Sequence, residues 1–180
     1  MLHVMTLGPD AASTGEAAAW APEFRDFFED EYERLGRAMF LLCGNADDAE
    51  DLTQEAFLRL YERWDRVRTM RSPDGYLYRT AMNLHRSRLR RLAAWARRRL
   101  EDEPGGGGQD PGVTLEVKDQ IARALGALPA GQRAALVLVE WLGMTDEEAG
   151  RILGVAPVSV RVRISRARAG LRSQFGGDDG

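Results

Sequence analysis

The chain has 180 residues, a formal net charge of −3 and 44% hydrophobic residues, which is enough for one domain of ordinary size or two small ones. No apolar run approaches the roughly 18 residues of a membrane-spanning helix, and no basic region precedes an apolar stretch at the N-terminus, so we expect a cytoplasmic protein with no membrane insertion. A single cysteine, Cys43, rules out an internal disulfide, and with only His3 and His85 we expect no metal site and no cofactor.

The charges are strongly segregated along the chain. Residues 23–55 contain eleven acids and three arginines, a net charge of −8, whereas residues 78–99 contain eight arginines and no acid. This asymmetry favours two different partners, one basic and one polyanionic, over a small-molecule enzyme. The alternative is that the two blocks neutralise each other within the fold.

Two helices with apolar stripes are predicted first. One runs from about Pro22 to Cys43, where a buried thiol is expected, and the other runs from about Ala46 to Trp64 with Asn45 or Asp47 as its cap. Apolar residues recur at steps of three and four in both segments, which is typical of amphipathic helices. These residues are Phe24, Phe27, Phe28, Tyr32, Leu35, Met39 and Leu42 in the first helix, and Ala49, Leu52, Ala56, Phe57, Leu60, Tyr61 and Trp64 in the second.

The third predicted helix carries most of the positive charge. Ser72 is a good capping residue and Pro73 suits the first helical position, so this helix is predicted from Pro73 to about Leu100. The following segment, EDEPGGGGQDPG, holds two prolines and five glycines in twelve residues and predicts a flexible linker.

The chain is therefore expected to be all-α, with two small helical domains joined by a flexible Gly/Pro-rich linker. The expected domains are residues 22–100 and 114–175, and the linker is 101–113. The N-terminal tail, 1–21, is expected to be disordered because it is small and polar with no apolar period, and 176–180 forms a second tail.

Helices are also predicted at residues 115–127, 130–141, 145–153 and 156–175. The last two have the form of a helix-turn-helix. Gly154 can adopt the left-handed conformation that ends a helix, and Thr145 and Glu148 predict a capping box.

The final helix is expected to enter a major groove. Val160 and Ile164 should anchor it to the core, and the stretch from Gly154 to Arg172 has five arginines and no acid. Plain helical hairpins show the same spacing, so the helix-turn-helix alone does not establish DNA binding.

Both parts of the chain, in this order, resemble the extracytoplasmic-function sigma factors of bacterial RNA polymerase. DDAEDLTQEAFLRLYERW is similar to the core-binding helix of that family, and PDGYLYRTAMNLHRSRLRR is similar to its promoter-melting segment. LPAGQRAALVLVEWLGMTDEEAGRILGVAPVSVRVRISRARAGLR is similar to its minus 35 recognition domain. The resemblance covers about residues 22–100 and 115–173.

The resemblance implies that the acidic second helix binds the core polymerase. Its partner there would be the clamp helices of the beta prime subunit, and the beta flap is a further expected contact of the chain. Carboxylates and amides that face basic groups form charge-assisted hydrogen bonds, although a merely solvated acidic face is the alternative. The implied contact residues are Asp48, Asp51, Gln54, Glu55 and Leu58.

For the third helix, the resemblance implies capture of the non-template strand of the minus 10 element during melting. Asn83 is expected to contact a base edge, because an amide both donates and accepts. Tyr76 can equally be a core residue, and Ser87 stands where the family usually has an aspartate, which leaves the base preference open. The other expected contacts are Tyr78 and Arg79 near the base, and Arg86, Arg88, Arg90 and Arg91 on phosphates.

For the final helix, the resemblance implies recognition of the minus 35 duplex. Arginine bidentate to guanine is the most common specific contact, and a valine suits a thymine methyl group. Gly150 stands where the family commonly has alanine and should weaken its helix slightly. The expected base contacts are Arg161, Val162, Ser165 and Arg166, and the expected phosphate contacts are Arg133, Ser159, Arg163 and Arg168.

The leading hypothesis is a sigma factor that directs core polymerase to promoters and helps to open the duplex, with no catalytic residues of its own. Its expected partners are RNA polymerase core and promoter DNA, double- and single-stranded. Members of the family are commonly held inactive by an anti-sigma factor, so such a protein is a further candidate partner.

Two other classes of function compete with this hypothesis. A stand-alone helix-turn-helix regulator would bind specific duplex DNA without polymerase. An enzyme is disfavoured, because the sequence contains no phosphate-binding glycine loop, nucleophile motif or paired-carboxylate site.

Overall fold

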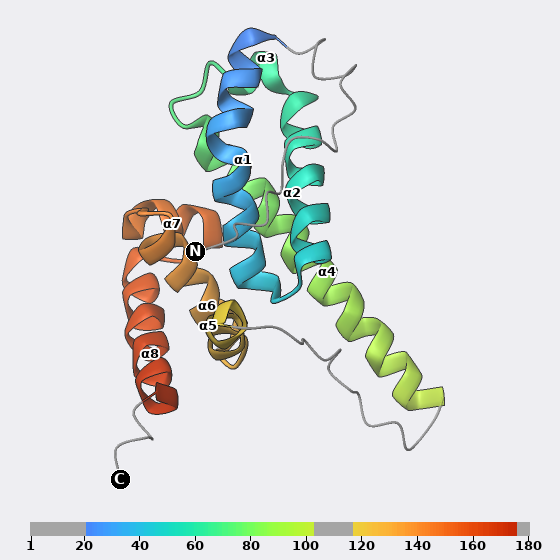
Figure 1. Ribbon diagram of the computed structural model, residues 1–180, viewed down its shortest axis with the longest axis vertical. Helices are drawn as coiled ribbons and strands as arrows, with labels where there is room; N and C mark the ends of the chain where they lie inside the picture. Colours follow the sequence, from blue (N-terminus) through green and yellow to red (C-terminus); the bar gives the residue numbers. More distant parts are fainter. Residues whose placement is uncertain (1–20, 103–116, 176–180) are drawn as a thin grey trace.

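The computed structural model describes residues 21–102, here called the N-terminal half, and residues 117–175, the C-terminal half (Figure 1). All regular structure in these two ranges is helical, which confirms the all-α prediction. No helix in these ranges is long and apolar enough to cross a bilayer. Nearly all of the predicted tails and most of the predicted linker lie outside the described residues.

The N-terminal half begins with two helices separated by a tight turn. Gly44 adopts the left-handed conformation, with φ of 70°, and ends the first helix. The Asn45 side chain then caps the second helix by accepting a hydrogen bond from the backbone N–H of Asp48. The helices of this half are α1 (Pro22–Cys43), α2 (Ala46–Tyr61), the short α3 (Trp64–Val67) and α4 (Pro73–Asp102).

The predicted boundaries in this half are confirmed except at the end of the second helix. The prediction continued it to Trp64, but α2 ends at Tyr61 and Trp64 begins α3. The apolar period continues across this break, because Trp64 is buried against the Phe24 ring at a centroid distance of 5.1 Å. Of the two predicted stripes, Tyr61 is the most exposed member at 40%.

The C-terminal half contains the predicted helix-turn-helix. Thr145 and Glu148 form the capping box, and Gly154 is left-handed with φ of 69°. The predicted helix at 130–141 is a single segment whose second part is a π-helix, which the periodicity did not indicate. The elements are α5 (Val117–Gly126), α6 (Ala130–Leu136), η3 (Val137–Trp141), α7 (Asp146–Leu153) and α8 (Pro157–Phe175).

Gly150 in α7 has a packing reason that the sequence did not indicate. A Cβ at this position would lie 2.8 Å from the carbonyl oxygen of Val155, closer than side chains approach a backbone atom. The turn after α7 folds back onto the helix at this point. Gly150 therefore permits the close approach of the turn. Its effect on stability does not follow from helix propensity alone.

The two halves pack against each other through a continuous core. Buried side chains of α1, α2 and α4 belong to the same cluster as those of α6, η3, α7 and α8. Three arginines also cross between the halves and donate to carbonyls at helix C-termini, where intrahelical partners are missing. These contacts join Arg34 to Leu142 O, Arg86 to Leu153 O at 3.0 Å and Arg133 to Leu42 O at 2.9 Å.

Candidate functional site

One face of α2 gathers the residues that were expected to bind the polymerase. They follow one another at steps of three or four along the helix, opposite the buried stripe, so they share one side of it. Leu58, the apolar residue among these polar and charged ones, is 63% exposed. We call this surface, made of Asp48, Asp51, Gln54, Glu55 and Leu58, the docking face.

Exposed contacts within α2 are easily exchanged. Glu55 accepts a hydrogen bond from Arg59 at 2.6 Å, and Gln54 donates to Glu50 at 2.7 Å. Both contacts are exposed pairs at i and i+4, each worth well under about 1 kcal/mol. A partner with basic groups can therefore replace them at little cost.

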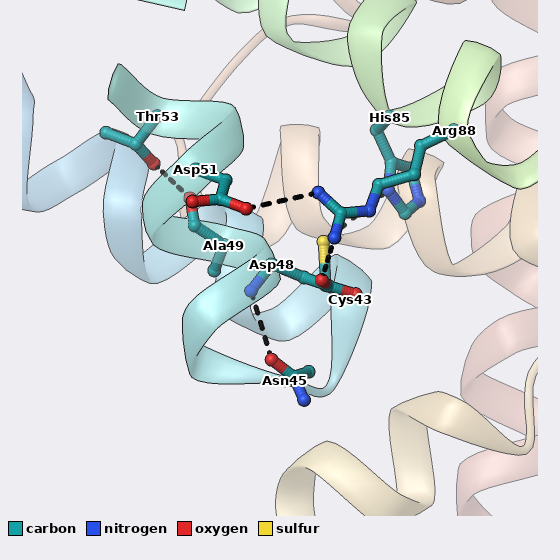
Figure 2. Close-up of polar contacts among 8 residues, drawn as sticks. All are labelled: Cys43, Asn45, Asp48, Ala49, Asp51, Thr53, His85 and Arg88. Atoms are coloured by element: carbon teal, nitrogen blue, oxygen red, sulfur yellow. Dashed lines mark hydrogen bonds and ion pairs between the residues drawn. The ribbon is translucent and has the colours of Figure 1, made fainter. Parts of the chain in front are cut away.

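Arg88 of α4 reaches across to the start of the docking face (Figure 2). Its guanidinium hydrogen-bonds the carboxylate of Asp48, and its Nη1 lies 3.6 Å from Oδ2 of Asp51. The side chains of Arg88 and Asp48 are about one-third exposed, whereas Asp51 is 69% exposed. Arg88 thus ties the N-terminal turn of α2 to α4.

Cys43, which was expected to be buried and is half-buried, pairs with the buried His85 beside this ion pair (Figure 2). The cysteine Sγ lies 3.5 Å from Nδ1 of the histidine. Burial raises the pKa of Cys43 to about 12 and lowers the pKa of His85, so both side chains are neutral near pH 7. The thiol is therefore a poor nucleophile, in line with a structural role.

A surface depression of about 520 Å³ lies between the end of α2 and the first turns of α4. It brings together Tyr76, Arg79 and Asn83, which the sequence placed near the same base. Arg63 donates a hydrogen bond to the Tyr76 hydroxyl at 2.9 Å, and Tyr76 is half-buried, so it both packs and lines the depression. We call this depression, lined by Arg59, Glu62, Arg63, Tyr76, Arg79, Thr80 and Asn83, the α2–α4 pocket.

The sequence did not indicate Arg59 and Arg63 as members of this pocket. Arg59 lies in the last turn of α2, and Arg63 lies just beyond the end of that helix, directly before α3. Their spacing was the available signal, but many solvated arginines share it. Only the packing of α4 beside the end of α2 brings both arginines to the same pocket.

Other residues expected near the minus 10 strand occupy different environments. Tyr78 is 1% exposed and donates to Glu31 at 2.6 Å, so it belongs to the core and not to the surface. Arg86 is held by the carbonyl of Leu153, whereas Arg90 and Arg91 are exposed on α4. The cationic surface is therefore narrower than the sequence predicted.

The outer face of α8 carries the side chains expected to recognise a duplex. Val160 and Ile164 are buried, which confirms that they anchor the helix. Val162 is 44% exposed. The exposed side chains along this face are Arg161, Val162, Ser165, Arg166 and Arg168, while Ser159 and Arg163 are half-buried.

Two of the α8 arginines have acidic neighbours within the C-terminal half. Arg161 lies 3.2 Å from Asp146 at the start of α7, and Arg168 pairs with Glu140 of η3. The arginine of each pair is more than half exposed, and such pairs are weak in water. Arg133, expected on a phosphate, instead donates to Leu42 of the other half.

Comparisons with known proteins show which family the chain is similar to. The family model for sigma-70 region 2 matches residues 27–103, and the model for sigma-70 region 4 matches residues 118–171. The chain is 34% identical over 166 residues to the ECF RNA polymerase sigma factor SigE of Mycolicibacterium smegmatis, covering 89% of this chain and 64% of that protein. It is 32% identical to the RNA polymerase sigma-E factor of Streptomyces avermitilis, covering 85% of each chain.

A solved structure has the same fold. The sigma factor RpoE of Bartonella quintana, determined in complex with the anti-sigma factor NepR, superposes with a TM-score of 0.73 at 24% identity. The similarity covers 88% of this chain and 99% of that chain. The described helices thus follow a fold that is already known.

Proposed function

The chain belongs to the extracytoplasmic-function sigma factors of bacterial RNA polymerase, and we propose how its surfaces divide the work of promoter recognition. The docking face binds the clamp helices of the beta prime subunit. The α2–α4 pocket holds an unstacked base of the minus 10 non-template strand. The outer face of α8 recognises the minus 35 duplex, so that each half acts as one DNA-recognition domain.

The α2–α4 pocket is the observation that carries this proposal. A strand-binding site needs cations for phosphates and a recess with a π surface and polar groups for a base. Arg59, Arg63 and Arg79 supply the charge, Tyr76 supplies the ring, and Asn83 supplies an amide that both donates and accepts. A regulator that binds only closed duplex has no use for such a recess.

The docking face and the pocket share α2, which supports a role in polymerase-dependent melting. Arg59 lines the pocket and also pairs with Glu55 of the docking face. Placing the polymerase on the docking face would therefore place the separated strand next to it, at the end of the same helix. In this arrangement the acidic residues of the docking face bind the polymerase, and the arginines of the α2–α4 pocket bind the DNA strand.

The outer face of α8 supports the minus 35 assignment. Arg166 is exposed between the anchor residue Ile164 and the buried Ala167, so its guanidinium can reach a guanine edge in the major groove. Val162, one helical turn earlier, presents a methyl-rich surface for a thymine. The protein acts by binding, and its activity requires the polymerase for chemistry.

An anti-sigma factor is proposed as a further partner. The sigma factor of Bartonella quintana was determined in complex with one, and the present fold is similar to it. The exposed Leu58 on the docking face is an apolar contact that such a protein could cover when the polymerase is absent.

The docking assignment is tested by charge reversal. The full-length chain with Asp51→Lys and Glu55→Lys should bind sigma-free core polymerase more than about 100-fold more weakly, because like charges would then meet. A double variant on α1, Glu29→Lys with Asp30→Lys, makes the same charge change on exposed residues away from the docking face and serves as the control.

Affinities are measured by fluorescence anisotropy of labelled chains, with circular dichroism to verify folding. Retained binding by the α2 variant would refute the docking assignment. Equal loss in both variants would show that only overall charge matters. Specific duplex binding by the wild type, with no binding to core, would favour the stand-alone regulator.

A further inference from the structure

Arg88 lies in the stretch of arginines expected to contact phosphates, but its surroundings point to another role. It does not line the α2–α4 pocket. Its guanidinium instead lies between the carboxylates of Asp48 and Asp51, the first two residues of the docking face (Figure 2). Its neighbours along the helix, Arg90 and Arg91, are exposed.

We propose that Arg88 is a positioning residue for polymerase binding and does not contact DNA, an inference that rests on the proposed docking face. Asp48 and Asp51 are one helical turn apart, so their carboxylates would repel each other without a shared cation. The planar guanidinium offers N–H groups on two sides, and here Nη2 faces Asp48 while Nη1 faces Asp51. Arg88 thereby fixes both carboxylates relative to α4.

The exposure of the three side chains fits this division. Asp48 and Arg88 are about two-thirds covered, so their contact is internal to the protein. Asp51 is 69% exposed and remains available to a basic group of a partner. Arg88 thus leaves one carboxylate pointing outward while it neutralises the one behind it.

A phosphate role for Arg88 would carry a cost that Arg90 avoids. Moving the guanidinium to a phosphate would leave the half-buried Asp48 without its cation, and a charge left unpaired in such a place is unfavourable. Arg90 is exposed, so it can reach a phosphate without breaking a contact of this kind. Substitution of Arg88 should therefore affect core binding, whereas substitution of Arg90 should affect strand binding.

The test compares Arg88→Gln with the matched variant Arg90→Gln in the full-length chain. Binding to sigma-free core polymerase is measured by anisotropy, and binding to a fluorescein-labelled single strand of twenty thymidines is measured across a salt series. Arg88→Gln should weaken core binding about tenfold, within the range of coupling between contacting residues, and leave the salt slope of strand binding unchanged. Arg90→Gln should leave core binding unchanged and reduce the slope by about 0.7, the value for one phosphate contact.

Arg88→Lys keeps the proposal testable if the glutamine variant does not fold. A lysine retains the charge, but its ammonium group is a point charge that cannot bind two carboxylates in the way a planar guanidinium does. Core binding by Arg88→Lys should therefore be weaker than that of the wild type but stronger than that of Arg88→Gln, with the salt slope of strand binding unchanged. In addition, Asp48→Asn and Arg88→Gln should be non-additive for core binding, because each removes the same contact.

Two results would overturn the inference. One is a fall of about 0.7 in the salt slope for Arg88→Gln, as for a phosphate contact, and the other is unchanged core binding in that variant. If the wild-type chain itself does not bind core polymerase, the proposed function fails and the inference fails with it. Normal wild-type binding with a phosphate-like Arg88 overturns the inference alone.

Discussion

Position 150 requires a glycine because the chain folds back on it. The Val155 carbonyl oxygen would lie 2.8 Å from an added Cβ, and this oxygen belongs to the backbone of the turn after α7. Gly36, in the middle of α1, is a matched case without this constraint, because its nearest neighbour would be a hydroxyl oxygen at 4.0 Å. The same substitution should therefore have opposite effects at the two sites.

Gly150→Ala should lower the free energy of unfolding by about 1–3 kcal/mol, because the turn must shift to make room. Gly36→Ala should raise it by about 0.5–1 kcal/mol through better helix propensity. Urea denaturation followed by circular dichroism measures both. Stabilisation by Gly150→Ala would show that the close approach of Val155 is not a constraint.

His85 should make stability depend on pH in the weakly acidic range. Burial, followed by the charges of Arg133 and Arg86, lowers its pKa from the usual 6.5. The unfolded chain takes up a proton near pH 6.5 while the folded protein does not, so the free energy of unfolding should fall as pH decreases below about 6.5 until the folded pKa is reached. The limiting slope for one group is about 1.4 kcal/mol per pH unit.

The variant His85→Gln provides the comparison for this slope. It should be less stable at pH 7, where it loses the contact with Cys43, but its stability should change less between pH 6.5 and 5. Chemical denaturation at closely spaced pH values measures both curves. Parallel curves for the two proteins would assign the pH dependence to other groups.

Environments of single residues could be predicted only in part. Val160 and Ile164 were identified as anchors because helical spacing determines which side faces the core. Tyr78 was expected near a base from the family resemblance, yet it is buried and its hydrogen-bond partner Glu31 lies 47 positions earlier. Local patterns do not contain such a pairing.

At the level of elements, α8 presents arginines in two different situations. Arg166 is exposed near the middle of the outer face, whereas Arg168 is paired with Glu140 of η3. A residue directed at bases affects sequence choice, and a residue directed at phosphates affects all sequences alike. Substituting each in turn separates these roles.

Arg166→Ala should weaken binding to the preferred minus 35 sequence by about 1–3 kcal/mol and relax the choice at one base. Arg168→Ala should weaken binding to all sequences equally and reduce the salt slope by about 0.9, as for one duplex phosphate. The holoenzyme is assayed on a set of duplexes with single-base changes. A uniform effect of both substitutions would contradict the division of roles along α8.

Helix boundaries were predictable where capping residues mark them. Gly44, Asn45, Thr145 and Gly154 each occupy the expected end of a helix, because capping depends on a few neighbouring atoms. The break before α3 and the π-helix η3 were not predicted, since neither has a cap or a change in apolar period.

At the scale of the whole molecule, the contact between the halves is the feature that the sequence predicted least. Arg86 and Arg133 were expected on phosphates, but each donates to a helix C-terminus of the other half. The contacts span 67 and 91 positions, and periodicity describes only neighbours within a helix. The charge segregation predicted two partners, while the structure adds that part of the positive charge is used inside the fold.

Run-off transcription tests the central claim most directly. Purified sigma-free core polymerase is combined with the full-length chain and a library of promoter fragments, and the transcripts are sequenced. The account predicts transcripts from a defined subset of fragments that share minus 35 and minus 10 elements, and none from core alone. Absence of promoter-specific transcripts, together with specific duplex binding by the chain alone, would contradict it.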